Sequence, residues 1–186
     1  MILDKPALRA SMRALRKRLA DADPLAAERV ASHAGDLPPG DLVALYRAIG
    51  SELGTDALAQ ALIASGRTLC LPVVLERDAA MIFRLWSPGD PLEMDVAGCP
   101  APFPLAATVI PDLILTPLLA FDDFGARLGQ GGGFYDRTFA ALPNVIRIGF
   151  AYDRQRLDDI PMQPHDQRLD GVLTEVGYQA SRGISR

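Results

Sequence analysis

Four apolar side chains recur near the start of the chain, Leu8, Met12, Leu15 and Leu19, at spacings of four, three and four residues. This spacing places them on one face of a helix, so it predicts an amphipathic helix over 5–20. Polar and basic residues fill the positions between them, as expected for the solvent-facing side of such a helix.

Beyond this helix, short apolar runs alternate with segments of helical character. Short apolar runs bounded by turn residues are typical of buried strands. Their alternation with helices predicts an α/β fold around a largely parallel sheet. The chain has no internal repeat, so residues 1–186 are expected to form a single domain. The further helices are expected over 24–34, 55–65 and 134–141, and the strands over 41–46, 69–75, 81–86, 112–116, 145–151 and 171–176.

Turn and capping residues set the expected boundaries of these elements. Asp4 and Thr55 are predicted to cap the helices that follow them, and Gly66 to end the second of these helices. Pro72 lies inside an expected strand, where its lack of an N–H group indicates an edge or irregular position. The proline-rich segment 88–111 is predicted to be a long irregular connection, and such connections are often functional.

The composition is that of a globular protein, with 49% hydrophobic and 23% charged residues, which excludes disorder as the dominant state. No apolar run approaches the roughly 18 residues that a membrane span needs, and the N-terminal segment does not read as a signal peptide. Cys70 and Cys99 have no Cys-x-x-Cys spacing, so they are interpreted as ordinary buried free thiols. A cytoplasmic location is therefore expected.

Charge is distributed unevenly along the chain. The first 18 residues hold six basic side chains and one acidic side chain, whereas the rest hold 13 basic and 22 acidic side chains. The acidic remainder argues against a broad nucleic-acid surface. Lys5, Arg9 and Arg13 stand four residues apart, and they form either a solvated cationic face or a site for an anionic ligand.

Four glycines fall within residues 129–133, after a loop expected over 121–128 and directly before a predicted helix. Glycine permits positive φ and close approach of a ligand to the backbone. Successive N–H groups at a helix N-terminus bind phosphate. The segment therefore predicts anion binding. The alternative is a mobile surface turn, but Phe134 and Tyr135 directly after the glycines indicate an anchored loop.

The glycine segment matches neither common nucleotide-binding motif. Phe134 stands where the dinucleotide fingerprint needs its third glycine. The chain contains no Gly-Lys pair, so it has no Walker sequence. If the segment holds nucleotide phosphates, their positive partners must therefore come from elsewhere. Arg127 and Arg137 flank the glycines, and both lysines of the chain lie in the first helix.

Two carboxylates complement the glycine segment. Asp136 lies in the first turn of the following helix, and Asp166 follows His165 in a proline-containing loop. One or two carboxylates together with phosphate oxygens suit Mg²⁺, although the helix dipole alone also favours Asp136. His165 has no second histidine at metal-ligand spacing, so a histidine-based zinc site is not expected.

Residues 127–137, Arg-Leu-Gly-Gln-Gly-Gly-Gly-Phe-Tyr-Asp-Arg, resemble the signature of the 5-formyltetrahydrofolate cyclo-ligase family. Lys5-Pro-Ala-Leu-Arg9 is similar to the N-terminal Lys-x-x-x-Arg of that family, and Glu52-Leu-Gly-Thr55 to its Glu-x-x-Thr element. The resemblance covers most of the chain. Its further matching segments are 112–122, 161–166 and 169–175.

The resemblance implies a three-layer α/β/α sandwich and an ATP- and Mg²⁺-dependent ligase. Its reaction converts 5-formyltetrahydrofolate to 5,10-methenyltetrahydrofolate with release of ADP and phosphate, through phosphorylation of the formyl oxygen and attack by N10. No protein nucleophile is expected, because phosphoryl transfer depends on positioning and charge neutralisation. The implied ATP ligands are Lys5, Arg9, Arg127, Leu128, Gly129, Gln130, Gly131, Gly132, Gly133, Phe134 and Tyr135; the implied folate contacts are Arg47, Glu52, Gln130, Gly131, Gly132, Gly133 and Phe134; the implied magnesium ligands are Asp136 and Asp166.

Three departures from the family pattern qualify this assignment. Phe134 stands where a tyrosine is usual in the family, which removes a hydroxyl group but keeps a ring for stacking on the pterin. Arg47 stands where a smaller or apolar residue is common near the folate. The segment Cys99-Pro-Ala-Pro102 lacks the glutamate that is often found before the proline there. Arg16 lies outside the matched motifs and is therefore expected to serve as a control position for Arg9.

Two other functional classes remain open on the sequence alone. An enzyme of similar architecture acting on sugar phosphates or coenzyme A would use the glycine segment without Mg–ATP. A nucleotide- or nucleic-acid-binding module would use the basic helix, but the acidic remainder of the chain argues against it. The resemblance implies ATP and 5-formyltetrahydrofolate as partners. No nucleic acid or membrane partner is expected, and the chain is expected to act as a monomer.

Overall fold

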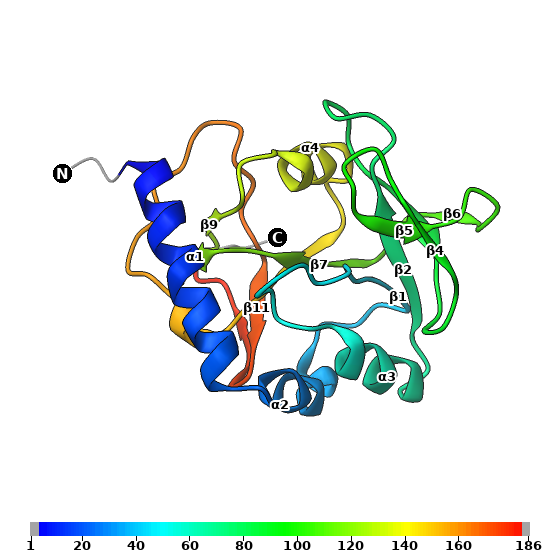
Figure 1. Ribbon diagram of the computed structural model, residues 1–186, viewed down its shortest axis with the longest axis horizontal. Coiled ribbons are helices and arrows are strands. Elements are labelled where there is room, and N and C mark those ends of the chain that lie inside the picture. Colours follow the sequence, from blue (N-terminus) through cyan, green and yellow to red (C-terminus); the bar gives the residue numbers. More distant parts are fainter. Residues whose placement is uncertain (1–3, 184–186) are drawn as a thin grey trace.

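The computed structural model describes residues 4–183. Within this range the chain forms a central sheet with helices packed on both of its faces (Figure 1). The helices are α1 (Lys5–Ala22), α2 (Ala26–Ser32), α3 (Asp56–Ala64) and α4 (Phe134–Ala141), with short 3₁₀ turns η1 (Ala34–Asp36) and η2 (Asp153–Gln155). The strands are β1 (Leu42–Ala44), β2 (Thr68–Val73), β3 (Ile82–Leu85), β4 (Leu92–Met94), β5 (Pro100–Pro102), β6 (Thr108–Val109), β7 (Leu113–Pro117), β8 (Ala120–Phe121), β9 (Arg127–Leu128), β10 (Ile146–Phe150), β11 (Gly171–Thr174) and β12 (Gly177–Ala180).

The main sheet has eight strands in the order β12-β11-β10-β7-β1-β2-β3-β6. The five strands from β11 to β2 run parallel to one another, and antiparallel strands close both edges. From β1 the chain passes through α3 to β2 on one side, whereas β7 on the other side leads through α4 to β10. The order therefore reverses between β1 and β7, and ligands of open α/β sheets bind at the carboxyl ends of strands beside such a point.

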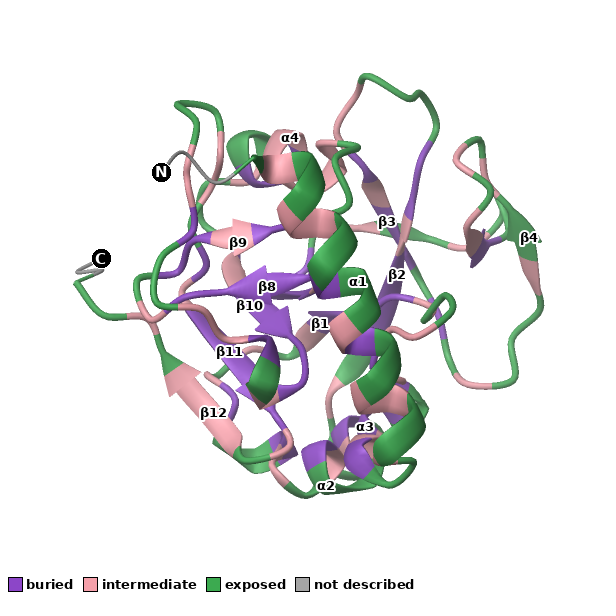
Figure 2. Ribbon diagram, turned by 60° about the vertical axis from the view of Figure 1, so that its left-hand side comes forward, coloured by how far each residue is buried: buried purple, intermediate pink, exposed green. Residues whose placement is uncertain are grey.

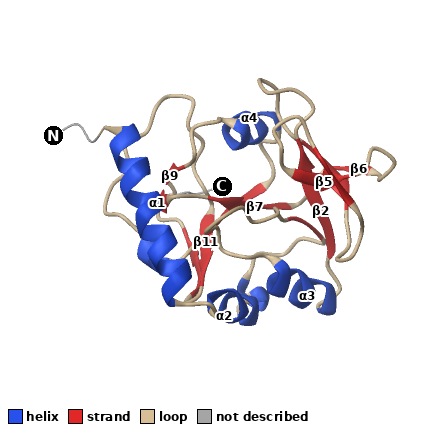
Figure 3. Cartoon of the chain, in the orientation of Figure 1, coloured by secondary structure: helices blue, strands red, loops and turns tan. Residues whose placement is uncertain are grey.

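Successive side chains of the central strands point to opposite faces of the sheet and pack into two separate hydrophobic cores. Leu113 and Leu115 of β7 pack with α2 and α3, whereas Ile114 packs with Phe139 of α4 on the opposite face. Burial on both faces is the reason why these parallel strands read as continuous apolar runs. Figure 3 shows α4 on one side of the sheet and α2 with α3 on the other, which is the three-layer α/β/α arrangement that the family resemblance implies.

Helix α1 lies across the end of this sandwich. Its apolar stripe packs through Met12 on residues of the β8–β9 hairpin, including Ala120 and Leu128. Figure 2 shows the opposite side of α1 exposed to solvent, whereas the central strands are buried. In the described part of the chain no helix is long and apolar enough to cross a membrane.

Several predicted elements are confirmed with small shifts at their ends. The helix predicted over 134–141 has those bounds, and the first helix extends two residues further than expected. Gly66 follows α3 with φ +87°, as expected of a helix stop. The predicted capping chemistry was wrong, because Asp4 and Thr55 occupy N-cap positions without side-chain capping bonds. The Thr55 hydroxyl instead donates to the Tyr46 carbonyl at 2.7 Å.

The proline-rich and loop segments contain more structure than predicted. The segment 88–111, expected to be irregular, carries β4, β5 and β6, and the expected loop over 121–128 contains most of the β8–β9 hairpin. The edge strand β12 was not predicted, because its half-exposed residues lack an apolar alternation. Pro72 lies in the interior strand β2, but only Thr68 to Cys70 of that strand pair with β1, so its missing N–H interrupts no ladder on that side.

Candidate active site

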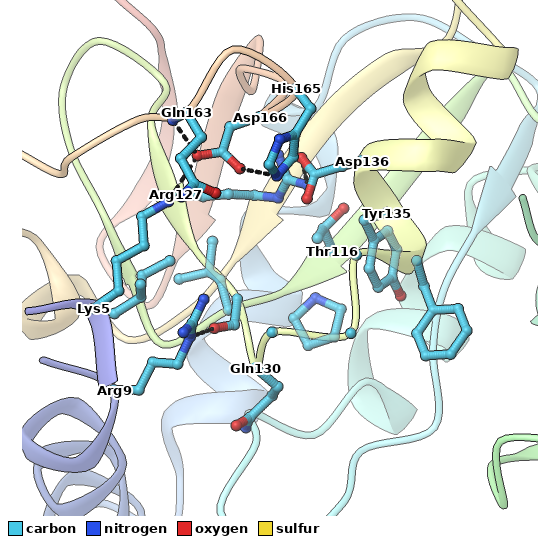
Figure 4. Close-up of a pocket in the computed structure, with 18 of the residues that line it drawn as sticks. Lys5, Arg9, Thr116, Arg127, Gln130, Tyr135, Asp136, Gln163, His165 and Asp166 are labelled. Atoms are coloured by element: carbon cyan, nitrogen blue, oxygen red, sulfur yellow. Dashed lines mark hydrogen bonds and ion pairs between the residues drawn. The ribbon is translucent and has the colours of Figure 1, made fainter. Parts of the chain in front are cut away.

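A polar cleft of about 280 Å³ opens above the carboxyl ends of β1 and β7. It lies between α1 and the start of α4, and Figure 4 shows the side chains that converge on it. The cleft is lined by Lys5, Arg9, Arg16, Glu52, Thr116, Pro117, Leu118, residues 127–136, Gln163, His165 and Asp166. All predicted ATP and magnesium residues therefore meet in one place, although they come from three distant parts of the chain.

The glycine loop, residues 129–133, forms one wall of the cleft. Gly131 and Gly133 adopt φ values of +105° and +69°, which side chains of other residues rarely tolerate. Gly133 is the N-cap of α4, so the loop ends on exposed N–H groups at a helix N-terminus. Arg137 stabilises the loop, since its guanidinium donates to the Gly132 carbonyl at 3.0 Å and lies 5.1 Å from the Phe134 ring centre.

The basic face of α1 forms the opposite wall. Arg9 Nε donates to the Gly129 carbonyl at 3.0 Å, and Arg13 Nε donates to Gln130 Oε1 at 2.8 Å. Any side chain added at Gly131 would meet the Arg9 guanidinium at 3.5 Å. The face formed by Lys5, Arg9 and Arg13 is therefore not simply solvated. It faces the glycine loop, which has no lysine of its own.

Asp136 and Asp166 lie on the same side of the cleft, each held by a cation (Figure 4). Arg127 donates to Asp136 Oδ1 at 2.7 Å, and the Gln167 N–H donates to the same oxygen at 2.9 Å. Lys5 Nζ lies 2.9 Å from Asp166 Oδ2. Although burial opposes it, hydrogen bonding by the Gln163 N–H and the charge of Lys5 hold the pKa of Asp166 below its ordinary value.

The carboxylates of Asp136 and Asp166 are suitable ligands for a Mg²⁺ ion that also binds phosphate. Among the residues that the structure describes, no group of three or more carboxylate, histidine or cysteine side chains is close enough to hold a metal alone. Two carboxylates in one cleft are the donors Mg²⁺ takes when phosphate oxygens and water complete its shell. In each carboxylate the described hydrogen bonds use one oxygen. The second oxygen of Asp166 lies 3.6 Å from His165 Nε2.

An apolar pocket of about 130 Å³ adjoins the polar cleft. The two share Glu52, Pro117, Phe134 and Tyr135, so a ligand in one can touch a ligand in the other. The remaining lining of the apolar pocket comes from the ends of β1 and β2 and from the segment before β5: Tyr46, Arg47, Ile49, Pro72, Val74, Met81, Asp95, Ala97, Cys99 and Pro100. A flat, largely apolar group with a few polar atoms suits such a lining.

Glu52 is the carboxylate at the junction of these two spaces. The Ile49 N–H donates to its Oε2 at 3.0 Å, and Arg16 Nη1 lies 3.6 Å from its Oε1. Burial raises the pKa of Glu52, while the Ile49 N–H and Arg16 counteract that rise. Glu52 can accept hydrogen bonds from a ligand in either space.

Two sequence-based expectations need correction, and a third gains detail. Arg16 is 6% exposed, lines the polar cleft and contacts Glu52, so it is no control position. Cys70 is buried as expected, but Cys99 is partly exposed and lines the apolar pocket. Arg47, an expected folate contact, lines the apolar pocket, where its guanidinium pairs with Asp56 and lies 5.5 Å from the Trp86 ring centre.

Sequence reasoning missed two polar residues of the cleft. Thr116 is 1% exposed, and its hydroxyl has no hydrogen-bond partner among the described residues. A polar residue near the carboxyl end of a buried parallel strand was a usable signal for it. Gln163 lines the cleft and donates its N–H to Asp166 at 2.7 Å. Its place in the family-matching segment 161–166 was the usable signal for it.

Comparison with known proteins gives a consistent result. The sequence model of the 5-formyltetrahydrofolate cyclo-ligase family matches residues 2–175. The chain is 40% identical to the 5-formyltetrahydrofolate cyclo-ligase of Mycolicibacterium smegmatis, over 73% of this chain and 74% of the relative. It is 34% identical to the enzyme of that name from Escherichia coli, over 71% of this chain and 76% of the relative.

Solved structures agree with these sequence relatives. The 5,10-methenyltetrahydrofolate synthetase of Aquifex aeolicus superposes with a TM-score of 0.79 at 28% identity, covering 98% of this chain and 95% of the other. The fold is also that of the 5,10-methenyltetrahydrofolate synthetase of Mycoplasma pneumoniae, with a TM-score of 0.73 at 24% identity, covering 93% and 99% of the two chains.

Proposed function

The chain belongs to the 5-formyltetrahydrofolate cyclo-ligase family, and from this premise we propose that it converts 5-formyltetrahydrofolate to 5,10-methenyltetrahydrofolate while ATP becomes ADP and phosphate. The observation that carries the proposal is the junction of a cationic polar cleft with an apolar pocket at Glu52, Phe134 and Tyr135. Such a junction can present a phosphoryl donor to a folate. An enzyme acting only on a sugar phosphate would have no use for the apolar pocket.

In this proposal ATP lies in the polar cleft with its phosphates on the glycine loop. Backbone N–H groups at the start of α4 would receive phosphate oxygens, as helix N-termini do. Lys5 and Arg9 would supply the positive charge that a P-loop lysine supplies in other nucleotide sites. Phosphate would offer Lys5 a second anionic partner besides Asp166.

Asp136 and Asp166 would hold Mg²⁺ beside these phosphates. When bound, the ion would neutralise phosphate charge and orient the phosphates for in-line transfer. Arg127 and the Gln167 N–H fix the carboxylate of Asp136. Lys5 and the Gln163 N–H do the same for Asp166. Both ligands are thus oriented by this chain's own residues.

The folate would place its pterin in the apolar pocket. Glu52 would accept hydrogen bonds from pterin N–H groups, and the ring of Phe134 would pack on the pterin face. The usual tyrosine hydroxyl is absent at Phe134, but Tyr135 next to it lines both spaces. Burial raises the pKa of the Tyr135 phenol, so its hydroxyl stays protonated and can donate.

The reaction needs no protein nucleophile. The formyl oxygen attacks the γ-phosphorus of ATP, the bond to ADP breaks, and the oxygen becomes part of a good leaving group. N10 then attacks the formyl carbon, loses its proton, and phosphate departs with the former formyl oxygen. The chain's residues contribute by holding both substrates at the junction, by neutralising charge and by excluding water.

A direct assay tests this proposal. Purified protein is mixed with 5-formyltetrahydrofolate, and the absorbance of the methenyl product is followed with and without Mg–ATP. We expect product to form only when both ATP and Mg²⁺ are present, with one ADP released per methenyl product. Turnover without ATP, or ATP hydrolysis without methenyl product, would contradict the proposal.

A further inference from the structure

Arg16 is the buried arginine on the inner face of α1. It follows Met12 by four residues and precedes Leu19 by three, so it falls on the apolar stripe that faces the protein. Its Nε donates to Ser51 Oγ at 3.2 Å and its Nη1 to the Leu118 carbonyl at 3.4 Å. A guanidinium this buried is costly unless it is paired, so the position of its partner matters.

The anionic partner of Arg16 is Glu52. Arg16 Nη1 lies 3.6 Å from Glu52 Oε1, and the two side chains are 7% and 12% exposed. Among the described residues, this is the one ion pair that Glu52 forms. The pair bridges two elements that are 36 residues apart, the helix that carries Lys5 and Arg9 and the segment that follows β1.

Glu52 faces few other groups that could balance its charge. The titratable groups that interact with it are Tyr46 after β1, Tyr135 of α4 and Cys99 before β5, and all of them are neutral near pH 7. Arg47 and Asp95 line the same apolar pocket, but Arg47 is paired with Asp56. The Ile49 N–H contributes a hydrogen bond at 3.0 Å. Among the described residues, Arg16 is therefore the one cation that forms an ion pair with this carboxylate.

We propose that Arg16 is a positioning residue for folate binding, which keeps the Glu52 carboxylate ionised and aimed at the junction of the cleft and the pocket. This inference rests on the proposed function, in which Glu52 accepts hydrogen bonds from the pterin. It assigns Arg16 a role through Glu52, and not as a ligand of ATP, although α1 also carries the proposed ATP ligands.

A pH-dependent loss of folate affinity follows from this role. Burial already raises the pKa of Glu52, and removal of Arg16 would leave only the Ile49 N–H to oppose that rise. Each further unit of pKa costs a tenfold loss of ionised carboxylate at pH values below the pKa. A protonated Glu52 loses acceptor capacity, so folate binding should weaken as the pH falls and recover as it rises.

The experiment compares Arg16→Met, Arg16→Lys and the matched control Arg18→Met, whose arginine is exposed on the same helix. The dissociation constant of 5-formyltetrahydrofolate is measured by calorimetry between about pH 6 and pH 8, and that of ATP is measured separately. For Arg16→Met we expect a loss of folate affinity of about tenfold at pH 8 that grows toward pH 6. Arg16→Lys should restore most of the affinity, and Arg18→Met should match the parent.

A double variant separates this inference from the proposed function. In the Glu52→Gln background, Arg16→Met should lower the affinity for 5-formyltetrahydrofolate by less than about twofold, because Arg16 then has no carboxylate to act on. This double variant also removes both buried charges, so it keeps the test available if Arg16→Met alone does not fold. Multiplicative losses, a pH-independent loss in Arg16→Met, or a loss confined to ATP would overturn the role of Arg16. Unchanged folate affinity in Glu52→Gln would instead overturn the assignment of Glu52.

Discussion

The polar cleft and the apolar pocket share a wall but are assembled in different ways. The cleft collects its cations and carboxylates from α1, from β9 and α4 on either side of the glycine loop, and from the loop around Asp166, which are far apart in sequence. The apolar pocket draws its surface from the ends of neighbouring strands and from the segment before β5. Binding a polyphosphate demands opposite charges at fixed positions, which several elements must supply, whereas an apolar wall follows from strands that end side by side.

The two regions should therefore respond differently to single substitutions. Changes in the cleft should affect ATP and Mg²⁺ and leave folate binding intact, and changes in the pocket should do the reverse. Residues at the junction should affect the chemical step. The five predictions that follow test this division, beginning with the largest expected effect.

The carboxylates of the cleft should be the most sensitive. Asp136→Asn and Asp166→Asn should each lower kcat/KM for ATP by about 100-fold, because several kcal/mol of metal-assisted charge stabilisation are lost. If they form one site, the double variant should lose far less than the product of the two single effects. Initial rates over a Mg²⁺ titration measure this, with the exposed Asp158→Asn as control. Strictly multiplicative losses would mean two independent roles.

The cationic wall should come next. Arg9→Ala should raise KM for ATP, or lower kcat/KM, by about tenfold to 150-fold, since charge-assisted contacts to phosphate contribute roughly 1.5–3 kcal/mol. Folate affinity should stay near the parent value. Arg18→Ala on the same helix is the matched control. Parent-like kinetics in Arg9→Ala would mean that Arg9 packs on the glycine loop without binding ATP.

On the pocket side, Glu52→Gln should weaken folate binding by about tenfold, because pterin N–H groups lose a charged acceptor. ATP binding measured without folate should stay within about twofold of the parent. Equilibrium titration of each substrate gives both values. A loss confined to ATP would move Glu52 from the folate side to the nucleotide side and break the division proposed above.

Thr116 lines the polar cleft next to Pro117, which the two regions share, and its substitution should separate an effect on stability from an effect on activity. Thr116→Val removes a buried hydroxyl without a partner among the described residues, so the Tm should hold or rise. If the hydroxyl serves a bound ligand, kcat should fall about fivefold to tenfold, as for the loss of one neutral hydrogen bond. Thr174→Val is the control, because its hydroxyl donates to the Gly177 carbonyl at 3.4 Å and its loss should lower the Tm. Unchanged kcat would make Thr116 a structural residue only.

The smallest effect is expected at Cys99. Cys99→Ala should change folate affinity by less than about threefold, because it removes only part of an apolar wall. Its thiol nevertheless reports on the pocket: we expect iodoacetamide to label Cys99 before Cys70 at pH 8, and folate to slow the reaction. Burial raises the pKa of Cys70 to about 12, so this thiol stays protonated and unreactive well above pH 8. Labelling of Cys99 that ATP slows but folate does not would contradict its place in the pocket.

Local patterns determined much of the fold. The glycine loop followed by a helix over 134–141 was predictable, because glycine conformation, capping and the helical period all act within a few residues. The buried strands β7 and β10 were predictable from continuous apolar runs. The same local reasoning failed for β12 and for β4 to β6, because short, half-exposed strands are defined by their partners and not by their own pattern.

The candidate site was likewise predictable only in part from the sequence. The sequence by itself identified the glycine loop, the basic helix and the residues implied by the family signature. Only the tertiary structure decided that Arg9 meets the glycine loop, that Asp136 and Asp166 line one cleft, and that Arg16 faces Glu52. Charges act through space over a few ångströms while the sequence records only order along the chain, so the partner of a buried charge becomes known only once the chain has folded.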